Sequence, residues 1–208
     1  MKIESILNKI NNLDKSIKKF MAEVNSPNQF RVYITKNKKM DLEINKFLNN
    51  IRRDVPLTFG SSILYIIGEL TDNIEQHSNY SNAFVFFRHS PKEKQVEAAV
   101  FDDGFSIPVV FEKNKIRFSK DFEAIKMAIE GKTTKKEDIS RGFGLRTIRE
   151  IVKALKGRIQ IISRKGMLDI QDSKIDVIDF EKDKLDGTFI YLKLKIPDKD
   201  LNIYSYLE

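Results

Sequence analysis

Residues 64–77 constrain the fold most, because apolar and polar side chains both follow helical spacing there, on two different faces. The apolar positions of this stretch are Leu64, Ile67, Leu70 and Ile74. They predict a helix from about residue 61 to residue 77 with one face in a hydrophobic core. Glu69, Asn73 and His77 stand four residues apart on a neighbouring face. This row has groups that polarise water, ligate a metal or contact an anion, although a solvated face is the simpler interpretation of the row alone.

The rest of the chain is a mixture of predicted strands and helices. Alternating apolar residues predict strands near residues 30–34, 83–88, 96–101, 158–163, 168–178 and 188–196. Helical spacing predicts further helices near residues 40–51, 121–129 and 145–155. The two kinds of element do not alternate as in a doubly wound sheet. We therefore expect an α+β fold, a two-layer sandwich with helices on one face of a mixed, mostly antiparallel sheet.

The domain organisation follows from length and from one heptad pattern. At 208 residues with 41% apolar content, the chain can bury one sizeable core, which we place in residues 28–208. Residues 1–27 carry an apolar repeat of seven made of Ile3, Ile6, Ile10, Leu13, Ile17, Phe20 and Val24. The corresponding helix either docks on its own domain or pairs with a second copy or another protein, and the pattern leaves both open.

Composition narrows the classes of function. The formal net charge is +7, but 30 acidic residues are interspersed with 37 basic ones, so a lysine-rich solvated surface explains the charge better than a nucleic-acid site. The absence of cysteine excludes disulfides and thiolate metal sites. No apolar run approaches the roughly 18 to 20 residues that span a bilayer, and residues 1–5 lack the core of a signal peptide. We expect a cytoplasmic protein without a membrane span.

Three further motifs carry groups suited to nucleotide binding. Asp102-Asp103-Gly104 ends a predicted strand and precedes Ser106-Ile107-Pro108. A carboxylate of this motif can accept a hydrogen bond from an amino group, and the glycine lets a flat ring approach the backbone. Arg141-Gly142-Phe143-Gly144-Leu145 opens a helix, where free backbone amides suit phosphate groups. Gly187-Thr188 places a hydroxyl at the start of the last strand. Each motif alone is weak, but their order and spacing together are much less common.

Together these motifs resemble those of the GHKL superfamily, the Bergerat-fold ATP-binding domains of gyrase, histidine kinases and MutL. The asparagine box of that family looks like residues 69–77, and its first glycine box matches residues 102–106, with Ser106 in place of the last glycine. The second glycine box matches residues 142–145, and the segments at residues 157–166 and 187–189 are similar to the strands that follow. The resemblance covers roughly residues 40–197 and implies a Bergerat ATP-binding fold.

The resemblance implies a role for each box. Asn73 would ligate the Mg²⁺ that bridges the phosphates of ATP, with waters and phosphate oxygens as the other ligands. Asp102 would accept from the adenine amino group, helped by Thr188 through water, and Gly104 would pass under the adenine. Glu69 matches the position that orients or deprotonates the attacking water in the ATPase members. The other nucleotide-binding residues implied are Ile107, Lys132, Thr133, Arg141, Gly142, Phe143, Gly144 and Leu145.

Residues 105–141 form a long, mostly polar stretch between two glycine signals. Its position predicts a mobile lid over the site, which would bring Lys132, Thr133 and Arg141 to the phosphates. Gly131-Lys132-Thr133 within it is not a P-loop, because such a loop needs a glycine where this chain has Lys126, and it follows a strand rather than a helix.

The expected activity is narrowed by the histidines. His77 and His89 are the two histidines of the chain, and neither lies on a helix before the ATP-binding region, so a self-phosphorylating histidine kinase is not expected. Three hypotheses stay open: a Mg-ATP-dependent ATPase or protein kinase module acting on or through a partner protein, an ATP-switched interaction module with little or no turnover, and a basic nucleic-acid-binding protein. A homodimer through the heptad helix is a further expectation.

Overall fold

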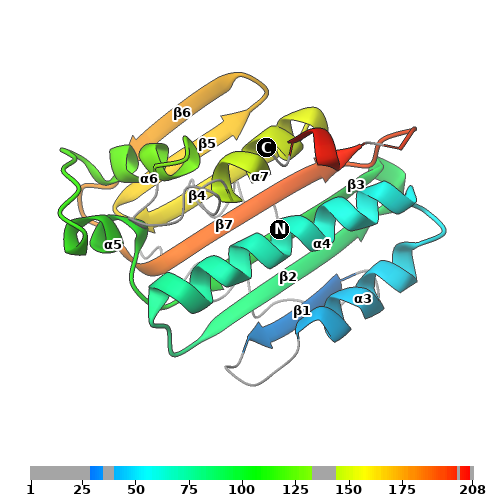
Figure 1. Ribbon diagram of the computed structural model, residues 1–208, viewed down its shortest axis with the longest axis horizontal. Helices are drawn as coiled ribbons and strands as arrows, with labels where there is room; N and C mark the ends of the chain where they lie inside the picture. The colour runs from blue at the N-terminus through cyan, green and yellow to red at the C-terminus, as the bar shows by residue number, and fades with distance from the viewer. Residues whose placement is uncertain (1–28, 35–39, 133–143, 201, 207–208) are drawn as a thin grey trace.

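The computed structural model describes residues 29–34, 40–132, 144–200 and 202–206, which form one sheet and the helices that cover it (Figure 1). The predicted heptad helix lies outside the described residues. So do residues 133–141 of the predicted lid, which include Thr133 and Arg141, and the neighbouring Gly142 and Phe143.

The sheet has seven described strands in the order β1-β2-β3-β7-β4-β5-β6. The strands are β1 (Gln29–Ile34), β2 (Ala83–Ser90), β3 (Gln95–Asp102), β4 (Arg158–Arg164), β5 (Gly166–Gln171), β6 (Lys174–Asp179) and β7 (Leu185–Lys195). Every neighbouring pair is antiparallel. The last strand in sequence thus lies in the middle of the sheet, between β3 and β4.

The described α-helices all lie on one face of this sheet (Figure 1). They are α3 (Met40–Ile51), α4 (Leu57–Asn73), α5 (Ile107–Lys113), α6 (Asp121–Ile129) and α7 (Gly144–Ala154). A π-helical turn, η1 (Ile74–Ser78), continues α4, and short 3-10 turns lie at Pro91–Glu93 and Ile203–Tyr206. None of the helices in these described ranges is long and apolar enough to cross a membrane.

The main core lies between the helices and the sheet. From α4 it takes Phe59, Ile63, Ile66, Ile67 and Leu70, all at most 2% exposed. These residues pack against alternate side chains of the central strands, such as Val100, Ile161 and Ile190. The apolar spacing of residues 64–74 is therefore explained by burial of one helix face on the sheet.

The predicted α+β class and the one-sided helix layer are confirmed, with three corrections. The sheet is antiparallel throughout its described pairs rather than mixed. The predicted strand at residues 168–178 is a hairpin of β5 and β6, because Asp172 takes a positive φ of 55° at a tight turn. Helix α5 was not predicted; Ser106 caps it, Pro108 fills its first turn, and Phe111 is buried beneath it.

Candidate functional site

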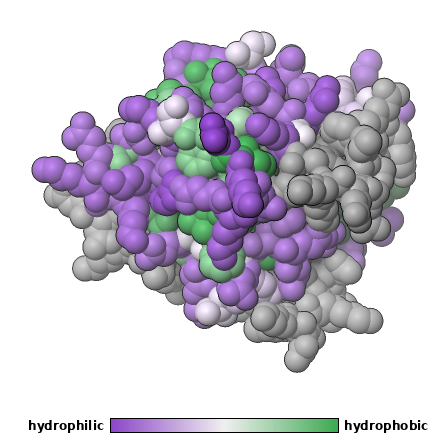
Figure 2. All heavy atoms as spheres, turned by 60° about the vertical axis from the view of Figure 1, so that its left-hand side comes forward, coloured by the Kyte–Doolittle hydropathy of each residue, from purple (hydrophilic) through white to green (hydrophobic). Residues whose placement is uncertain are grey.

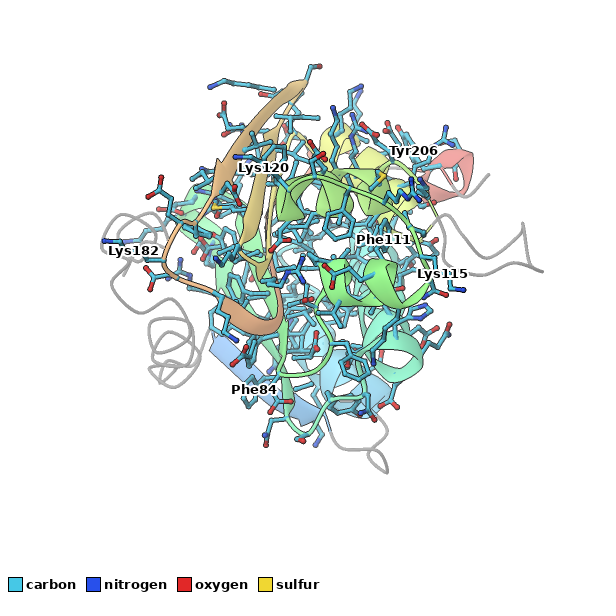
Figure 3. The ribbon with its side chains drawn as sticks, turned by 90° about the vertical axis from the view of Figure 1, so that its left-hand side faces the viewer. Phe84, Phe111, Lys115, Lys120, Lys182 and Tyr206 are labelled. Atoms are coloured by element: carbon cyan, nitrogen blue, oxygen red, sulfur yellow. The ribbon has the colours of Figure 1, made fainter. Side chains whose placement is uncertain are left out.

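The predicted site residues that the structure describes gather at one end of the sandwich. There β3 ends, β7 begins, α4 passes into η1, and α7 starts (Figure 1). Figure 2 shows hydrophobic surface in the middle of this side of the molecule, surrounded by hydrophilic side chains. Figure 3 views the same end, with Phe111 of α5 turned to the interior and Lys115 and Lys120 at the outside.

Three neighbouring strands place polar side chains side by side on the helix-covered face. Asp102 of β3 is in register with Thr188 of β7, which is in register with Ser163 of β4. The hydroxyl oxygens of Ser163 and Thr188 lie 2.9 Å apart. The Ser163 hydroxyl also accepts a hydrogen bond from the Ile107 amide at 2.9 Å. The row therefore connects the end of the sheet to the start of α5.

Asp102 contributes the carboxyl group of this row and is buried, at 4% exposure. Burial raises its pKa to about 7, opposed by hydrogen bonds from the Gly104 amide and the Ser78 hydroxyl. Since a carboxylate has about four acceptor positions, these two donors leave room for another. A buried carboxyl group with a pKa near 7, beside two hydroxyl groups, is suited to bind a ligand that donates hydrogen bonds.

The adjacent Asp103 has a structural role. Its carboxylate accepts from the backbone amides of Ser81 and Asn82, at 2.8 and 2.7 Å, and from the Asn82 side chain at 2.6 Å. Although burial opposes it, these donors hold the pKa of Asp103 below its ordinary value. Asp103 fastens the loop before β2, whereas Asp102 faces the helix layer.

Gly104 is required by a close approach of the chain to itself. A Cβ there would lie 2.2 Å from the Ser78 carbonyl oxygen, and the same oxygen accepts from the Phe105 amide at 2.5 Å. The structure places η1 against this glycine, and the predicted approach of a flat ring to its backbone stays a prediction. The glycine thus holds the turn after Asp102 against the end of the central helix.

Gly187 fixes the other side of Asp102. Its φ is +103°, and a Cβ there would lie 1.8 Å from the Asp102 carbonyl oxygen. Any side chain at residue 187 would therefore push β3 and β7 apart where Asp102 and Thr188 face each other. The predicted Gly187-Thr188 motif works as a pair: the glycine permits the contact, and the threonine supplies the hydroxyl.

Glu69 belongs to α4, and its side chain lies beside the first residue of α7. A Cβ on Gly144, the first residue of α7, would be 2.3 Å from Glu69 Oε2. Tyr65 is hydrogen-bonded to both Glu69 and Thr147, so this contact joins the two helices. Burial, opposed by the Tyr65 hydrogen bond and assisted by Asp72, raises the pKa of Glu69.

Glu69 and Asn73 share one face of α4, but His77 does not continue it. Asn73 is the last residue of α4 and is half-buried, but His77 lies in the π-helical turn η1. Because π-helical bonds run to the fifth residue rather than the fourth, the wider turn moves His77 off the line that uniform spacing predicts. Glu69 and Asn73 remain one turn apart on the same face of α4.

The other predicted contacts that the structure describes are Lys132, Leu145 and Ile107. Lys132 is exposed, and its Nζ lies 3.6 Å from Met127 Sδ, which directs it toward α6. Leu145 packs against the main core. Ile107 joins the site through its backbone amide, which donates to Ser163.

The predicted magnesium site requires one ligand from the protein. Among the described residues, no group of three or more His, Asp or Glu side chains is placed to hold a metal ion. Asn73 was expected to be the single protein ligand, with phosphate oxygens and waters completing the shell, and its half-buried amide at the end of α4 fits that task.

Comparison with protein-family models found no match for this chain, and no curated protein matches it either.

Three residues of the site were not predicted: Ser78, Ser163 and Tyr65. Ser163 continues the inward-facing positions of Ile159 and Ile161, so a fully buried hydroxyl in an apolar alternation was a usable signal. Ser78 and Tyr65 gave no such signal, because their roles come from contacts with residues distant in sequence.

Proposed function

We propose that this chain binds Mg-ATP at the end of the sheet and acts as an ATPase or protein kinase module of the GHKL type, on or through a partner protein. The observation that carries the proposal is the buried Asp102, in register with Thr188 and held between Gly104 and Gly187. In a Bergerat fold this strand end receives the adenine, and an antiparallel sheet with a one-sided helix layer is compatible with that fold.

Recognition of the base is assigned to the strand-end row. The Asp102 carboxylate accepts from the exocyclic amino group of adenine, and the Thr188 hydroxyl bridges to the ring through water. Ser163 orients Thr188, because their hydroxyl oxygens are 2.9 Å apart. A purine without the amino group leaves the buried Asp102 without its partner, so discrimination against it is strong.

The phosphate end is assigned to α4 and the start of α7. Asn73 contributes the protein ligand to Mg²⁺, which neutralises charge on the phosphates. The backbone at Gly144 faces the phosphates, since a helix N-terminus favours anions. Glu69 lies beside Gly144, and its raised pKa favours acceptance of a proton from the attacking water.

A second candidate is an ATP-switched interaction module with little or no turnover. It is favoured by the hydrogen bonds of Tyr65 with Glu69 and Thr147, because they give Glu69 a structural role between α4 and α7. A ligand that displaced Glu69 would change this helix contact, and a partner that reads the change would need no hydrolysis.

The test is calorimetric titration of the purified protein with ATP and Mg²⁺, followed by assays of phosphate release and phosphate transfer. Saturable binding that is lost in Asp102→Asn supports the proposal. Asp172→Asn is the matched control, because Asp172 is an exposed turn residue with positive φ, which asparagine tolerates. Equal binding by wild type and Asp102→Asn would remove the proposed site. ATP binding by the wild type without turnover favours the second candidate.

A further inference from the structure

The edge strand β6 exposes apolar side chains on both faces of the sheet. Among the described residues, the exposed large hydrophobic side chains are Leu57, Val177 and Ile178, and the last two are neighbours on β6, each 45% exposed. Ile175 packs against the main core, which places Val177 on the helix-covered face and Ile178 on the opposite one. A single exposed side chain such as Leu57 is ordinary, but two on one edge strand indicate an interaction surface.

β6 is also open on one side within the described sheet. It stands last in the strand order, and Figure 1 shows it at the upper margin of the sheet, with no described element beyond it. Its register with β5 runs from Lys174 to Asp179 without a shift, and the strand contains no proline. Bulges and prolines commonly protect edge strands from pairing with another chain, and β6 has neither.

The backbone groups that face the open edge belong to Ile175, Val177 and Asp179. Gln171 and Lys174 flank a two-residue turn and therefore form a hydrogen-bonded pair of the β5–β6 hairpin. Hydrogen-bonded pairs alternate along an antiparallel ladder, so every second residue from Lys174 onward directs its N–H and C=O groups to β5. The three residues between them direct theirs outward, where another strand can donate and accept.

The charges of β6 do not oppose association with a like strand. Asp176 is paired with Lys174 at 2.9 Å, and Asp179 is paired with Lys120 of α6 at 3.1 Å. Unpaired charges on an edge strand discourage a second strand, but both carboxylates here already have a cation. The edge is therefore locally neutral.

We propose that β6 pairs antiparallel with β6 of a second copy, so that the two sheets become one across a two-fold axis. An axis perpendicular to the sheet keeps each side chain on its own face, so opposing residues differ by an even number of positions. With the axis at Val177, the three outward-facing residues oppose the same three of the second copy, and all their N–H and C=O groups are paired. An axis at Asp176 or Ile178 instead leaves one outward-facing residue of each copy opposite a residue beyond the strand.

This register also covers both exposed side chains. Val177 lies directly opposite Val177 of the second copy on the helix-covered face. On the other face, Ile178 is diagonal to Ile178 of the second copy, within reach of long side chains. Each exposed aliphatic residue is thus covered by the same residue of the second copy, as an isologous interface requires.

The helix layer leaves room for this pairing. The axis puts the helices of both copies on the same side, and α6 packs on β5, where a Cβ on Gly166 would lie 2.4 Å from the Phe122 amide nitrogen. The two β5 strands would stand about 14 Å apart, which is three strand spacings. Packed helices need about 8 to 10 Å, so the two α6 helices do not clash. The inference does not depend on nucleotide binding, because β6 lies outside the strands that carry Asp102, Thr188 and Ser163.

The experiment is sedimentation velocity of the full-length chain in a concentration series up to about 100 µM, since small interfaces dissociate in the micromolar range. We expect the wild type to form a dimer in reversible equilibrium with the monomer. Val177→Lys should raise the dimer dissociation constant at least about tenfold, because two ammonium groups would oppose each other. Leu57→Lys is the matched control, the same change at an exposed aliphatic residue outside β6, and should leave the constant unchanged.

A charge exchange tests the two-fold register. Val177→Lys and Val177→Glu should each be monomeric alone, whereas their equimolar mixture should dimerise, because lysine then opposes glutamate. Val177→Pro removes an outward N–H without disturbing the ladder to β5. It should abolish the dimer and change the thermal unfolding of the monomer little.

A wild type that stays monomeric throughout the series would overturn the proposal. A dimer that Val177→Lys leaves intact would do the same, because the contact would then lie elsewhere in the chain. Equal loss of the dimer in Leu57→Lys, or a mixture of the two charge variants that stays monomeric, would contradict the pairing at Val177.

Discussion

Glu69 Oε2 occupies the space that a side chain at Gly144 would need, 2.3 Å from the position of a Cβ there. The absence of a side chain at the first residue of α7 thus lets a carboxylate from α4 reach the helix N-terminus, where the helix dipole stabilises negative charge. The proposed water-activating group therefore lies beside the proposed phosphate-binding turn, and the hydrogen bonds of Tyr65 with Glu69 and Thr147 join the same two helices.

Gly144→Ala tests this relationship. The added methyl group meets the end of the Glu69 side chain, so we expect Glu69 to turn away at a cost of about 1 kcal/mol in stability. Phosphate release should fall at least about tenfold, because the proton acceptor is displaced. The measurements are turnover and thermal unfolding.

Gly68→Ala is the matched control, one residue from Glu69 on α4. A Cβ there meets nothing within 4 Å. The change should stabilise the protein by roughly 0.5 to 1 kcal/mol, as alanine replaces glycine inside a helix, with turnover unchanged. If the two variants lose turnover equally, the Glu69–Gly144 contact has no functional role.

Asp102→Asn should bind no ATP and yet be more stable than the wild type at pH 8. Burial raises the pKa of Asp102 to about 7, from an ordinary value near 3.8, so ionisation of this group above pH 7 destabilises the folded state. Asparagine removes the buried charge, and since one pKa unit corresponds to about 1.36 kcal/mol, we expect a gain of about 4 kcal/mol at pH 8 in denaturant unfolding.

The pH dependence of that gain has a definite sign. The folded wild type binds more protons than the unfolded chain between about pH 4 and pH 7, so the contribution of Asp102 to stability falls as pH rises through this window. The difference between variant and wild type should therefore grow from pH 4 to pH 7 and then level off. A constant difference would mean that Asp102 is not the buried titrating group.

ATP affinity should weaken below pH 7. Only the ionised Asp102 can offer all its acceptor positions to the adenine amino group, and about half of it is ionised at its pKa of about 7. If the ionised form alone binds, affinity falls about tenfold for each pH unit below that value. Titration calorimetry from pH 5.5 to pH 8.5 measures this, and a flat profile down to pH 5.5 would contradict the assignment.

Thr188→Val removes a hydroxyl without changing the size of the side chain. We expect ATP affinity to fall by about 1 to 2 kcal/mol, because the water bridge and its Ser163 partner are lost. Lys193→Met, on the opposite face of the same strand, controls for nonspecific effects on β7. An unchanged affinity of Thr188→Val would show that this hydroxyl serves only the sheet.

Much of the architecture was predictable because it depends on local periodicity. The helix at residues 121–129 and the strands around residues 83–101 were placed within one or two residues of α6, β2 and β3. Helix α5 was missed because its start depends on the Ser106 cap and Pro108 rather than on an apolar repeat. The spacing of Glu69, Asn73 and His77 predicted one shared face, and a π-helical turn altered it at His77.

The sequence by itself determined most of the helices and strands and the spacing of the motifs that contain Glu69, Asp102 and Thr188, since both depend on neighbours along the chain. Tertiary structure alone decided that Asp102 and Thr188 stand opposite each other, because β7 inserts between β3 and β4. It also decided that burial raises the pKa of Asp102, whereas hydrogen bonds from the loop before β2 lower the pKa of Asp103. The two residues are adjacent and both are aspartates. Burial and hydrogen bonding depend on surroundings in space, and residues far apart in the chain supply those surroundings.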